Sequence, residues 1–311
     1  MSKHDSTVEK NINFMGQRFI AMVFSGLLLI ASIGSLVVNG LQFGLDFTGG
    51  LQIEAEFAEK ADLEKVRTIL AESGFADASI VYFGAETEVM VRTQQELKKG
   101  VKEKILSALE ASTDSGVTIK RIEFVGPQVG DELRDQGGIG MLFALAVVMA
   151  YVALRFQFKF SVAAVAALIH DVIIVLGIFS IFKFDFDLTV LAAVLAVIGY
   201  SLNDTIVVSD RIRENFRKLR TGSAVEIINT SLTQTLGRTL VTSLTTMLVL
   251  LALFFVGGEL IHAFSIALII GIVVGTYSSI YVAANVLLLM QITKEDLIVP
   301  VKEGAEFDDL P

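Results

Sequence analysis

The chain has 311 residues, no cysteine and a formal net charge of −9. The lack of cysteine excludes disulfides, thiol catalysis and cysteine-type zinc sites, and the acidic balance argues against nucleic acid as a main partner. The hydrophobic share of 53% is close to that of ordinary globular domains. Its distribution is more informative, because long charge-free apolar runs flank one charged block near residues 54–135. This split predicts a chain of two parts.

Six stretches are long and apolar enough to cross a membrane, which takes about 20 mostly apolar residues. In chain order they are 19–38, 139–154, 160–182, 188–209, 234–256 and 263–290. The first stretch could be a cleaved signal peptide, whose apolar region usually has about 7–15 residues. Because this stretch is longer and five more follow it, we expect it to remain as the first membrane helix.

The positive charges of the short loops predict the orientation, because such loops carry more Lys and Arg on the cytoplasmic side. The basic residues on one side are Arg18, Arg155, Lys159, Arg211, Arg213, Arg217, Lys218 and Arg220. The loops on the other side, 183–187 and 257–262, are poor in positive charge. Both termini are therefore predicted to be cytoplasmic. The predicted parts are a cytoplasmic segment 1–18, a helix 19–38, an outside domain 39–137, five helices within 138–292 and a cytoplasmic tail 293–311.

The outside domain alternates between strand and helix patterns. Period-two apolar positions predict strands at 51–58, 77–83, 86–92 and 117–125, and amphipathic periodicity predicts helices at 61–73 and 95–111. The order βαββαβ indicates a small α+β, ferredoxin-like unit. Roughly 75 residues can bury a modest core. We find no catalytic constellation in it, and its mixed charges are expected to form a solvated face or, alternatively, a contact surface for a partner or an unfolded chain.

Ionisable side chains inside the apolar stretches are expensive, so each is a functional hypothesis. The third stretch contains His170 and Asp171, the fourth contains Asn203 and Asp204, and the fifth contains Arg238. At 1.5 Å per residue, the predicted spans place Asp171, Asp204 and Arg238 about 16, 8 and 6 Å from their cytoplasmic ends. We therefore expect them at overlapping depths in the inner half of the membrane.

A carboxylate in a low-dielectric medium tends to take up a proton, and a nearby arginine favours its anion. An ion pair between Asp204 and Arg238 that forms and breaks would capture and release protons. One charge moved through 100 mV is worth ~2.3 kcal/mol, which is enough to bias a two-state element. The alternative is a static buried ion pair that fixes helix packing. His170 could likewise relay protons or only satisfy a packing bond.

Two further patterns have structural and functional interpretations. Thr242 lies one turn beyond Arg238, so it could line a hydrated path, or it could bond back to its own helix, the commoner role. The sixth stretch has small residues at every fourth position, which predicts close helix packing. They are Ala267, Gly271, Gly275, Ser279 and Ala283.

Four segments of the chain carry distinctive motifs. Gly-Leu-Asp-Phe-Thr-Gly-Gly at 44–50 follows the first span, and Val-Gly-Pro-Gln-Val-Gly-Asp-Glu-Leu at 125–133 precedes the second. The other two are the segments 199–215 and 231–246. All four resemble the SecD/SecF family of protein-export subunits, and the Asn-Asp-Thr order at 203–205 resembles its SecF branch. The resemblance covers residues 11 to about 292. Its motif residues here are Asp46, Gly49, Gly50, Gly126 and Pro127.

The resemblance implies half of a resistance–nodulation–division transporter core in a bacterial inner membrane. It implies a SecD partner, the SecYEG channel and YajC nearby, membrane lipid around the helices, and a translocating polypeptide as cargo. The implied role is to use the proton motive force in late translocation, without a cofactor, a metal or an enzymatic activity. The family's proton-path aspartate and arginine match Asp204 and Arg238. We add Asn203, Thr242 and Asp171 as candidates for the same path.

Three alternatives remain open. A half-transporter for small molecules would need a large outside domain or a substrate cavity, and the outside segment has only about 99 residues. An intramembrane aspartyl protease would need a Gly-x-Gly-Asp context, which neither Asp171 nor Asp204 has. A passive scaffold of the export channel would leave a buried acid and base as an unexplained cost.

Overall fold

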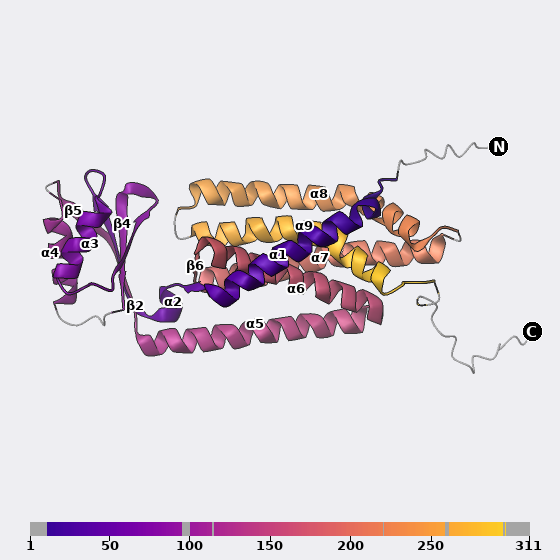
Figure 1. The fold of residues 1–311 in the computed structure, drawn as a ribbon, viewed down its shortest axis with the longest axis horizontal. Helices are drawn as coiled ribbons and strands as arrows, with labels where there is room; N and C mark the ends of the chain where they lie inside the picture. Colours follow the sequence, from indigo (N-terminus) through magenta and orange to yellow (C-terminus); the bar gives the residue numbers. More distant parts are fainter. Residues whose placement is uncertain are drawn as a thin grey trace, which may run out of the picture.

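The computed structural model describes residues 11–94, 100–113, 115–219, 221–258, 261–294 and 296. A small sheet domain lies at one end of a bundle of long helices (Figure 1). We call this the domain end, and we call the opposite end, where the first long helix begins and the last one finishes, the terminal end. Arg220, residues 1–10, the first five residues of the predicted helix 95–111 and most of the predicted tail lie outside the described residues.

In the part of the chain that the structure describes, six helices are long and apolar enough to cross a membrane, and the prediction of six spans is confirmed. They are α1 (Arg18–Val38), α5 (Pro127–Arg155), α6 (Phe158–Phe182), α7 (Leu188–Lys218), α8 (Ala224–Val256) and α9 (His262–Leu289). Three of them extend well past the predicted apolar runs. Pro127 begins α5 well before its apolar run, and α7 continues far beyond Ser209. Helix α8 begins well ahead of Gln234, at a capping box formed by Ser223 and Glu226.

The sheet domain has the predicted order of elements. They are β2 (Gly50–Phe57), α3 (Leu63–Glu72), β3 (Ser79–Phe83), β4 (Ala85–Thr93), α4 (Val101–Ala111) and β5 (Val117–Val125). The strand order is β3-β4-β2-β5 with antiparallel neighbours, which confirms the ferredoxin-like prediction. Alternate residues of β2 and β4, such as Ile53 and Val91, pack with Leu70 of α3 and Ile105 of α4 in one core. Asp62 caps α3 by accepting from the N–H groups of Glu64 and Lys65.

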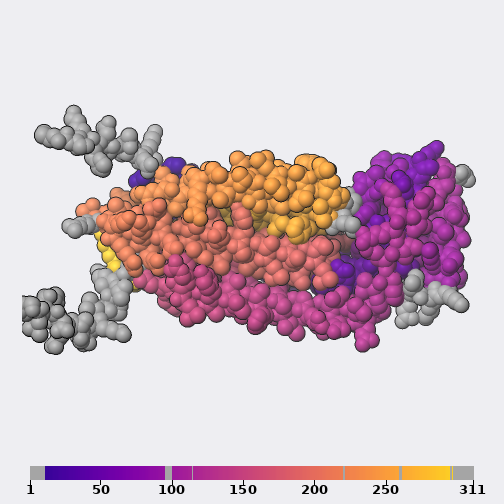
Figure 2. Space-filling view, turned by 180° about the vertical axis from the view of Figure 1, so that it is seen from behind, coloured from indigo at the N-terminus to yellow at the C-terminus, as the bar shows by residue number. Residues whose placement is uncertain are grey.

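The helices of the bundle are buried to very different extents. Helix α6 is mostly enclosed and α7 is buried along one side, whereas α5 and α8 leave most of their apolar surface uncovered. Figure 2 shows α8 and α5 along opposite edges of one face, with α7 between them. We call this the α5–α7–α8 face.

The two segments that flank the sheet domain pack against each other. Gly49 has φ +65°, and a Cβ on it would meet Pro127 Cα at 2.9 Å. A Cβ on Gly50, at φ +117°, would overlap the carbonyl oxygen of Thr93. Gly126 is the N-cap of α5 and Pro127 its first residue. Gly49 and Gly50, at the start of β2, are therefore required by backbone conformation and by the close approach of other backbone atoms, where the chain enters and leaves the domain.

The same junction holds the domain to the outer ends of α6 and α7. The short strand β1 (Gln42–Phe43) pairs with β6 (Asp185–Phe186) between these helices. Asp185 accepts from Gln42 Nε2 at 3.0 Å and forms an ion pair with Arg92 of β4, also at 3.0 Å. Asp46, in the short helix α2 (Leu45–Thr48), accepts from the N–H of Leu188, the first residue of α7, at 3.1 Å. The domain is thus fastened to the end of α7.

Replacing Asp185 with asparagine is expected to loosen the domain from the bundle. The pair with Arg92 is only partly exposed, 19% and 29% for the two side chains, so its loss should cost about 1 kcal/mol. The chain has no cysteine, so spin labels attached at Lys102→Cys in the sheet domain and Val256→Cys in the bundle report the distance between these two sites alone. The distribution of this distance should be broader in Asp185→Asn than in the protein with Asp185. Glu64→Gln, which breaks an exposed pair within α3, should leave it unchanged. An unchanged distribution in Asp185→Asn would show that Arg92 does not fasten the domain.

Candidate functional site

The ionisable groups inside the bundle lie near the middle of their helices. Asp204 lies about four helical turns before Lys218, the end of α7, and Arg238 lies about as far beyond Ala224, the start of α8. Asp171 is at a similar distance from the first residue of α6. At 1.5 Å per residue all three are roughly 20 Å from the terminal ends of their helices. These distances run to the helix ends, which lie beyond the apolar runs, so the depths of about 8 and 6 Å for Asp204 and Arg238, counted from the ends of those runs, stay a prediction.

Asp204 is buried between α7, α8 and α9, with 7% of its surface exposed. Thr239 Oγ1 donates a hydrogen bond to its Oδ1 at 2.7 Å. Its Oδ2 is buried and has no hydrogen-bond partner among the described residues. Beside it, the hydroxyls of Thr205 and Ser279 bond to each other at 3.0 Å. Asp204 therefore joins α7 to α8 through one oxygen and keeps the other free.

The predicted ion pair between Asp204 and Arg238 is not formed in this structure. Neither carboxylate oxygen accepts from Arg238, whose side chain is exposed on α8. Successive residues of a helix point about 100° apart, so Thr239 faces α7 while Arg238 turns toward the α5–α7–α8 face. A static buried ion pair, the structural alternative for these residues, is therefore absent from the described residues.

The other predicted residues on this face are also exposed. Asn203 and Thr242 lie on the uncovered sides of α7 and α8. Thr242 Oγ1 donates to the carbonyl of Arg238 at 3.0 Å, so the prediction that it bonds back to its own helix is confirmed. The site has an inner part, Asp204 and Asp171, and an outer part, Asn203, Arg238 and Thr242.

Asp171 is fully buried and fully bonded. Its Oδ1 bonds to Nδ1 of His170 at 2.9 Å, and its Oδ2 accepts from Ser201 of α7 and from Ser278 of α9, the latter at 2.7 Å. Nε2 of His170 continues to Ser25 Oγ of α1 at 3.2 Å. This cluster fastens four helices together, and among its described atoms Asp171 has no vacant oxygen.

The hydroxyl partners of the two carboxylates and of His170 were not predicted from the sequence, although Ser201 and Thr239 stand out as polar residues inside apolar stretches. Thr239 bonds Asp204, Ser201 and Ser278 bond Asp171, and Ser25 bonds His170. A possible signal existed for Ser201, which lies three residues before Asp204 and so shares a helix face with it. The others sit on separate helices, and nothing local identifies their partners.

Chemically, the two carboxylates differ in one respect. Asp171 has hydrogen bonds to both oxygens, whereas Asp204 has a buried oxygen that can hold a proton, and a cation lies next to its threonine partner on α8. Buried charge needs compensation by a partner or a proton. Within the described residues, no group of three or more His, Cys, Asp or Glu side chains could hold a metal ion.

These features define a multi-pass membrane protein with ionisable groups at the middle of its bundle. The model described as "SecD/SecF GG Motif" matches residues 34–61, and the one described as "Protein export membrane protein SecD/SecF, C-terminal" matches residues 105–293. The chain belongs to the SecD/SecF family of protein export membrane proteins. The predicted family resemblance is confirmed, and family membership with six spans makes the chain a multi-pass inner-membrane protein.

The similar proteins cover nearly the whole chain. The protein translocase subunit SecF of Vibrio alginolyticus is 51% identical over 308 residues, which is 97% of this chain and 98% of that one. The subunit of the same name from Pseudomonas aeruginosa is 50% identical over 96% of this chain and 98% of its own length. A crystal structure of SecDF from Thermus thermophilus matches with TM-score 0.84 and 38% identity over 92% of this chain. The chain spans only 39% of that longer protein.

Proposed function

We propose that this chain is a non-enzymatic subunit of the Sec protein-export machinery that couples the proton motive force to late translocation of polypeptides. It would act with a SecD partner, beside the SecYEG channel and with YajC. The observation that carries the proposal is the Asp204 carboxylate at the middle of the bundle, with one buried oxygen unpartnered among the described residues. The SecDF structure supports the pairing with SecD, because this chain aligns with 39% of that protein.

The proposed cycle has two ways to compensate the charge of Asp204. A proton at Oδ2 removes the charge, and approach of Arg238 pairs it, so each makes the other unnecessary. In this structure Thr239 holds Oδ1, and Arg238 is exposed and forms no ion pair with Asp204, which corresponds to the separated state. Rotation of α8 that brings Arg238 toward α7 would release the proton. Asn203 and Thr242 would line the path, and Asp171 would hold α6, α7 and α9 in place beside it or take part in proton transfer.

The partner is proposed to cover the α5–α7–α8 face. An arginine facing lipid at the middle of a membrane is costly, and both Arg238 and Asn203 are exposed there. A second six-helix half on this face would remove both from lipid and enclose the proton path. The small-molecule half-transporter and the passive scaffold would not require gradient-dependent behaviour of Asp204.

The orientation is proposed from the loop charges. Basic residues cluster at the terminal end, where Arg213, Arg217 and Lys218 extend α7 beyond its apolar part, and loops rich in such residues stay in the cytoplasm. Both termini would then be cytoplasmic, and the segment 39–137 with its sheet domain would be periplasmic.

Asp204→Asn is expected to abolish the gradient-stimulated part of export and leave the gradient-independent part unchanged. Asparagine keeps the bond from Thr239 but cannot release a proton. The measurement is completion of translocation in inverted membrane vesicles, with and without an imposed proton gradient, at matched subunit abundance and with co-purified SecD quantified. Asp210→Asn makes the same chemical change further along α7, at an ion pair with Arg213, and should keep the stimulation. Normal stimulation in Asp204→Asn would remove the proton role from this site.

A further inference from the structure

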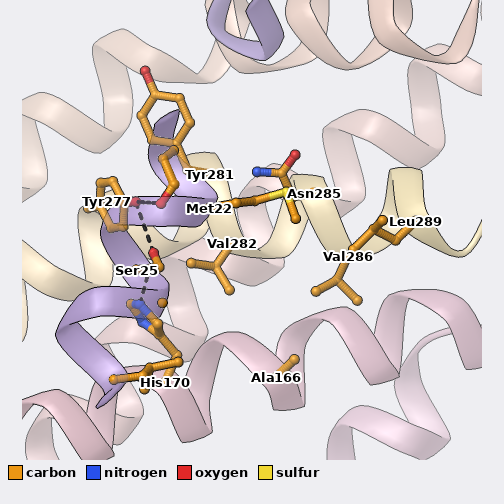
Figure 3. Close-up of a pocket in the computed structure, with 13 residues that line it drawn as sticks. Met22, Ser25, Ala166, His170, Tyr277, Tyr281, Val282, Asn285, Val286 and Leu289 are labelled. Atoms are coloured by element: carbon orange, nitrogen blue, oxygen red, sulfur yellow. Dashed lines mark hydrogen bonds between the residues drawn. The ribbon is translucent and has the colours of Figure 1, made fainter. Parts of the chain in front are cut away.

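A narrow apolar crevice lies between α1, α6 and α9, away from the α5–α7–α8 face (Figure 3). Its volume is about 300 Å³. Ala166 lies on the α6 side, and Val282, Val286 and Leu289 follow one another along α9 (Figure 3). Met22 and Leu29 of α1 form the third wall. The crevice runs from the middle of the bundle toward the terminal end.

The dimensions of the crevice fit one hydrocarbon chain. From Tyr277 to Leu289 the α9 wall has a length of roughly 18 Å at 1.5 Å per residue, slightly more than the ~15 Å of one leaflet's hydrocarbon. A volume of about 300 Å³ spread over this length describes a slot that is much narrower than it is long. A helix with its side chains is about 10 Å across, so a helix of a partner protein does not fit inside it.

The polar groups at the deep end of the crevice are already bonded to one another. Ser25 Oγ lies 2.9 Å from Tyr277 Oη and 3.2 Å from His170 Nε2, and Tyr277 Oη also donates to the carbonyl of Ala21 at 2.7 Å. Figure 3 shows these hydrogen-bonded side chains at the deep end of the crevice. None of these three side chains needs water as a partner, so an apolar occupant is favoured over water.

Arg18 is the basic residue one turn before the α1 wall of the crevice, and in this structure its guanidinium lies 4.9 Å from the centre of the Phe19 ring. Arg18 lies four, seven and eleven residues before Met22, Ser25 and Leu29, so it shares their helix face. Within the described residues Arg18 forms no ion pair, and its carbonyl accepts from Asn285 Nδ2 of the α9 wall at 3.5 Å. Arginine binds phosphate through a planar fork of donors. The geometry points to an anionic phospholipid, with one acyl chain in the crevice and its phosphate at Arg18.

This lipid would join α1 to α9 on the side opposite the proposed SecD partner. Its acyl chain gains little free energy by leaving the bilayer for the crevice, because both surroundings are apolar. Selectivity should therefore come from the headgroup, as in basic pockets between membrane helices. The site does not depend on the proton role of Asp204.

The test uses the full-length chain in nanodiscs containing phosphatidylglycerol and phosphatidylethanolamine, with native mass spectrometry of retained lipid. The protein should retain phosphatidylglycerol preferentially, and Arg18→Gln should lower that retention about tenfold, the loss of one charge-assisted contact. The control Arg217→Gln removes an exposed arginine at the terminal end of α7 and should change nothing. Ala166→Phe fills the crevice and should remove bound lipid of both kinds, whereas Leu154→Phe, at a position 90% exposed on α5, should not.

A second measurement does not depend on any variant. Phosphatidylglycerol with a diazirine near the middle of its acyl chain should label peptides containing residues 21–29 and 277–289 of the unmodified chain. Equal retention in Arg18→Gln and Arg217→Gln would overturn the headgroup assignment. Labelling that extends equally to α5 and α8 would contradict a lipid site between α1 and α9. Loss of the labelling on α1 and α9 when another subunit co-purifies would show that the crevice binds that subunit and not a lipid.

Discussion

Arg238→Met is expected to abolish gradient-stimulated export as completely as Asp204→Asn, while assembly with SecD remains normal. Methionine keeps an unbranched side chain but removes the charge proposed to replace the proton on Asp204. Without it, the carboxylate has no second form of compensation, so proton release stops. The two residues act on one step, so the double variant should be no worse than either single variant. The measurement is translocation in inverted vesicles with and without the gradient.

Two substitutions test whether the charge itself is required. Arg238→Lys keeps the charge but loses the planar fork, so it should retain part of the stimulation. Arg217→Met removes an exposed cation at the terminal end of α7 and should leave the stimulation intact. Full stimulation in Arg238→Met would contradict an exchange between proton and arginine, even if Asp204→Asn were inactive.

The long helix α7 connects the proposed proton site with the sheet domain. Its first residue, Leu188, donates to Asp46 of the Gly-Leu-Asp-Phe-Thr-Gly-Gly segment. Asp204 lies roughly 24 Å further along the same helix at 1.5 Å per residue. A tilt of α7 at Asp204 would move its outer end and the segment bonded to it. The family motif at 44–50 attaches the domain to the end of this helix through Asp46.

Sequence patterns were sufficient for the architecture but not for the helix ends. The apolar runs predicted six spans, and period-two and period-3.6 patterns predicted the ferredoxin-like order, because these signals come from burial itself. The extensions of α5, α7 and α8 are polar helices outside the apolar runs. A search for apolar runs cannot find them, although Pro127 and the Ser223–Glu226 capping box mark two of the starts.

The site was predictable in its carboxylates but not in its contacts. Asp171 and Asp204 stand out because ionisable residues are rare in apolar stretches. Their partners, Thr239 and Ser278, are hydroxyl residues of a kind that usually bond back to their own helix, as Thr242 does. Which hydroxyl reaches a neighbouring helix depends on helix rotation and pairing, and a single sequence does not contain either.

Gly271→Ala is expected to destabilise the bundle, although alanine normally favours a helix by about 1 kcal/mol over glycine. Gly271 of α9 packs on Val197 of α7, and an added Cβ would overlap Cγ2 and lie 2.9 Å from Cβ of this valine. Val197 is 1% exposed and β-branched, so it has no rotamer to escape into. Overpacking of this kind costs about 1–3 kcal/mol. The thermal midpoint of the purified protein, followed by size-exclusion chromatography after heating, should fall.

The matched control is Gly34→Ala on α1, where an added Cβ has nothing within 4 Å, so the midpoint should stay or rise. Val197→Ala in the Gly271→Ala background removes both overlapping methyl groups but leaves Cβ at 2.9 Å, so it should restore part of the loss, the signature of two coupled residues. The predicted small-residue stripe would then be a steric requirement, because Gly275 makes the same approach to Ser201 one turn away, at 3.1 Å. Equal midpoints for Gly271→Ala and Gly34→Ala would show that α7 and α9 can move apart at no cost in stability. Close packing of these two helices would then not be a steric requirement.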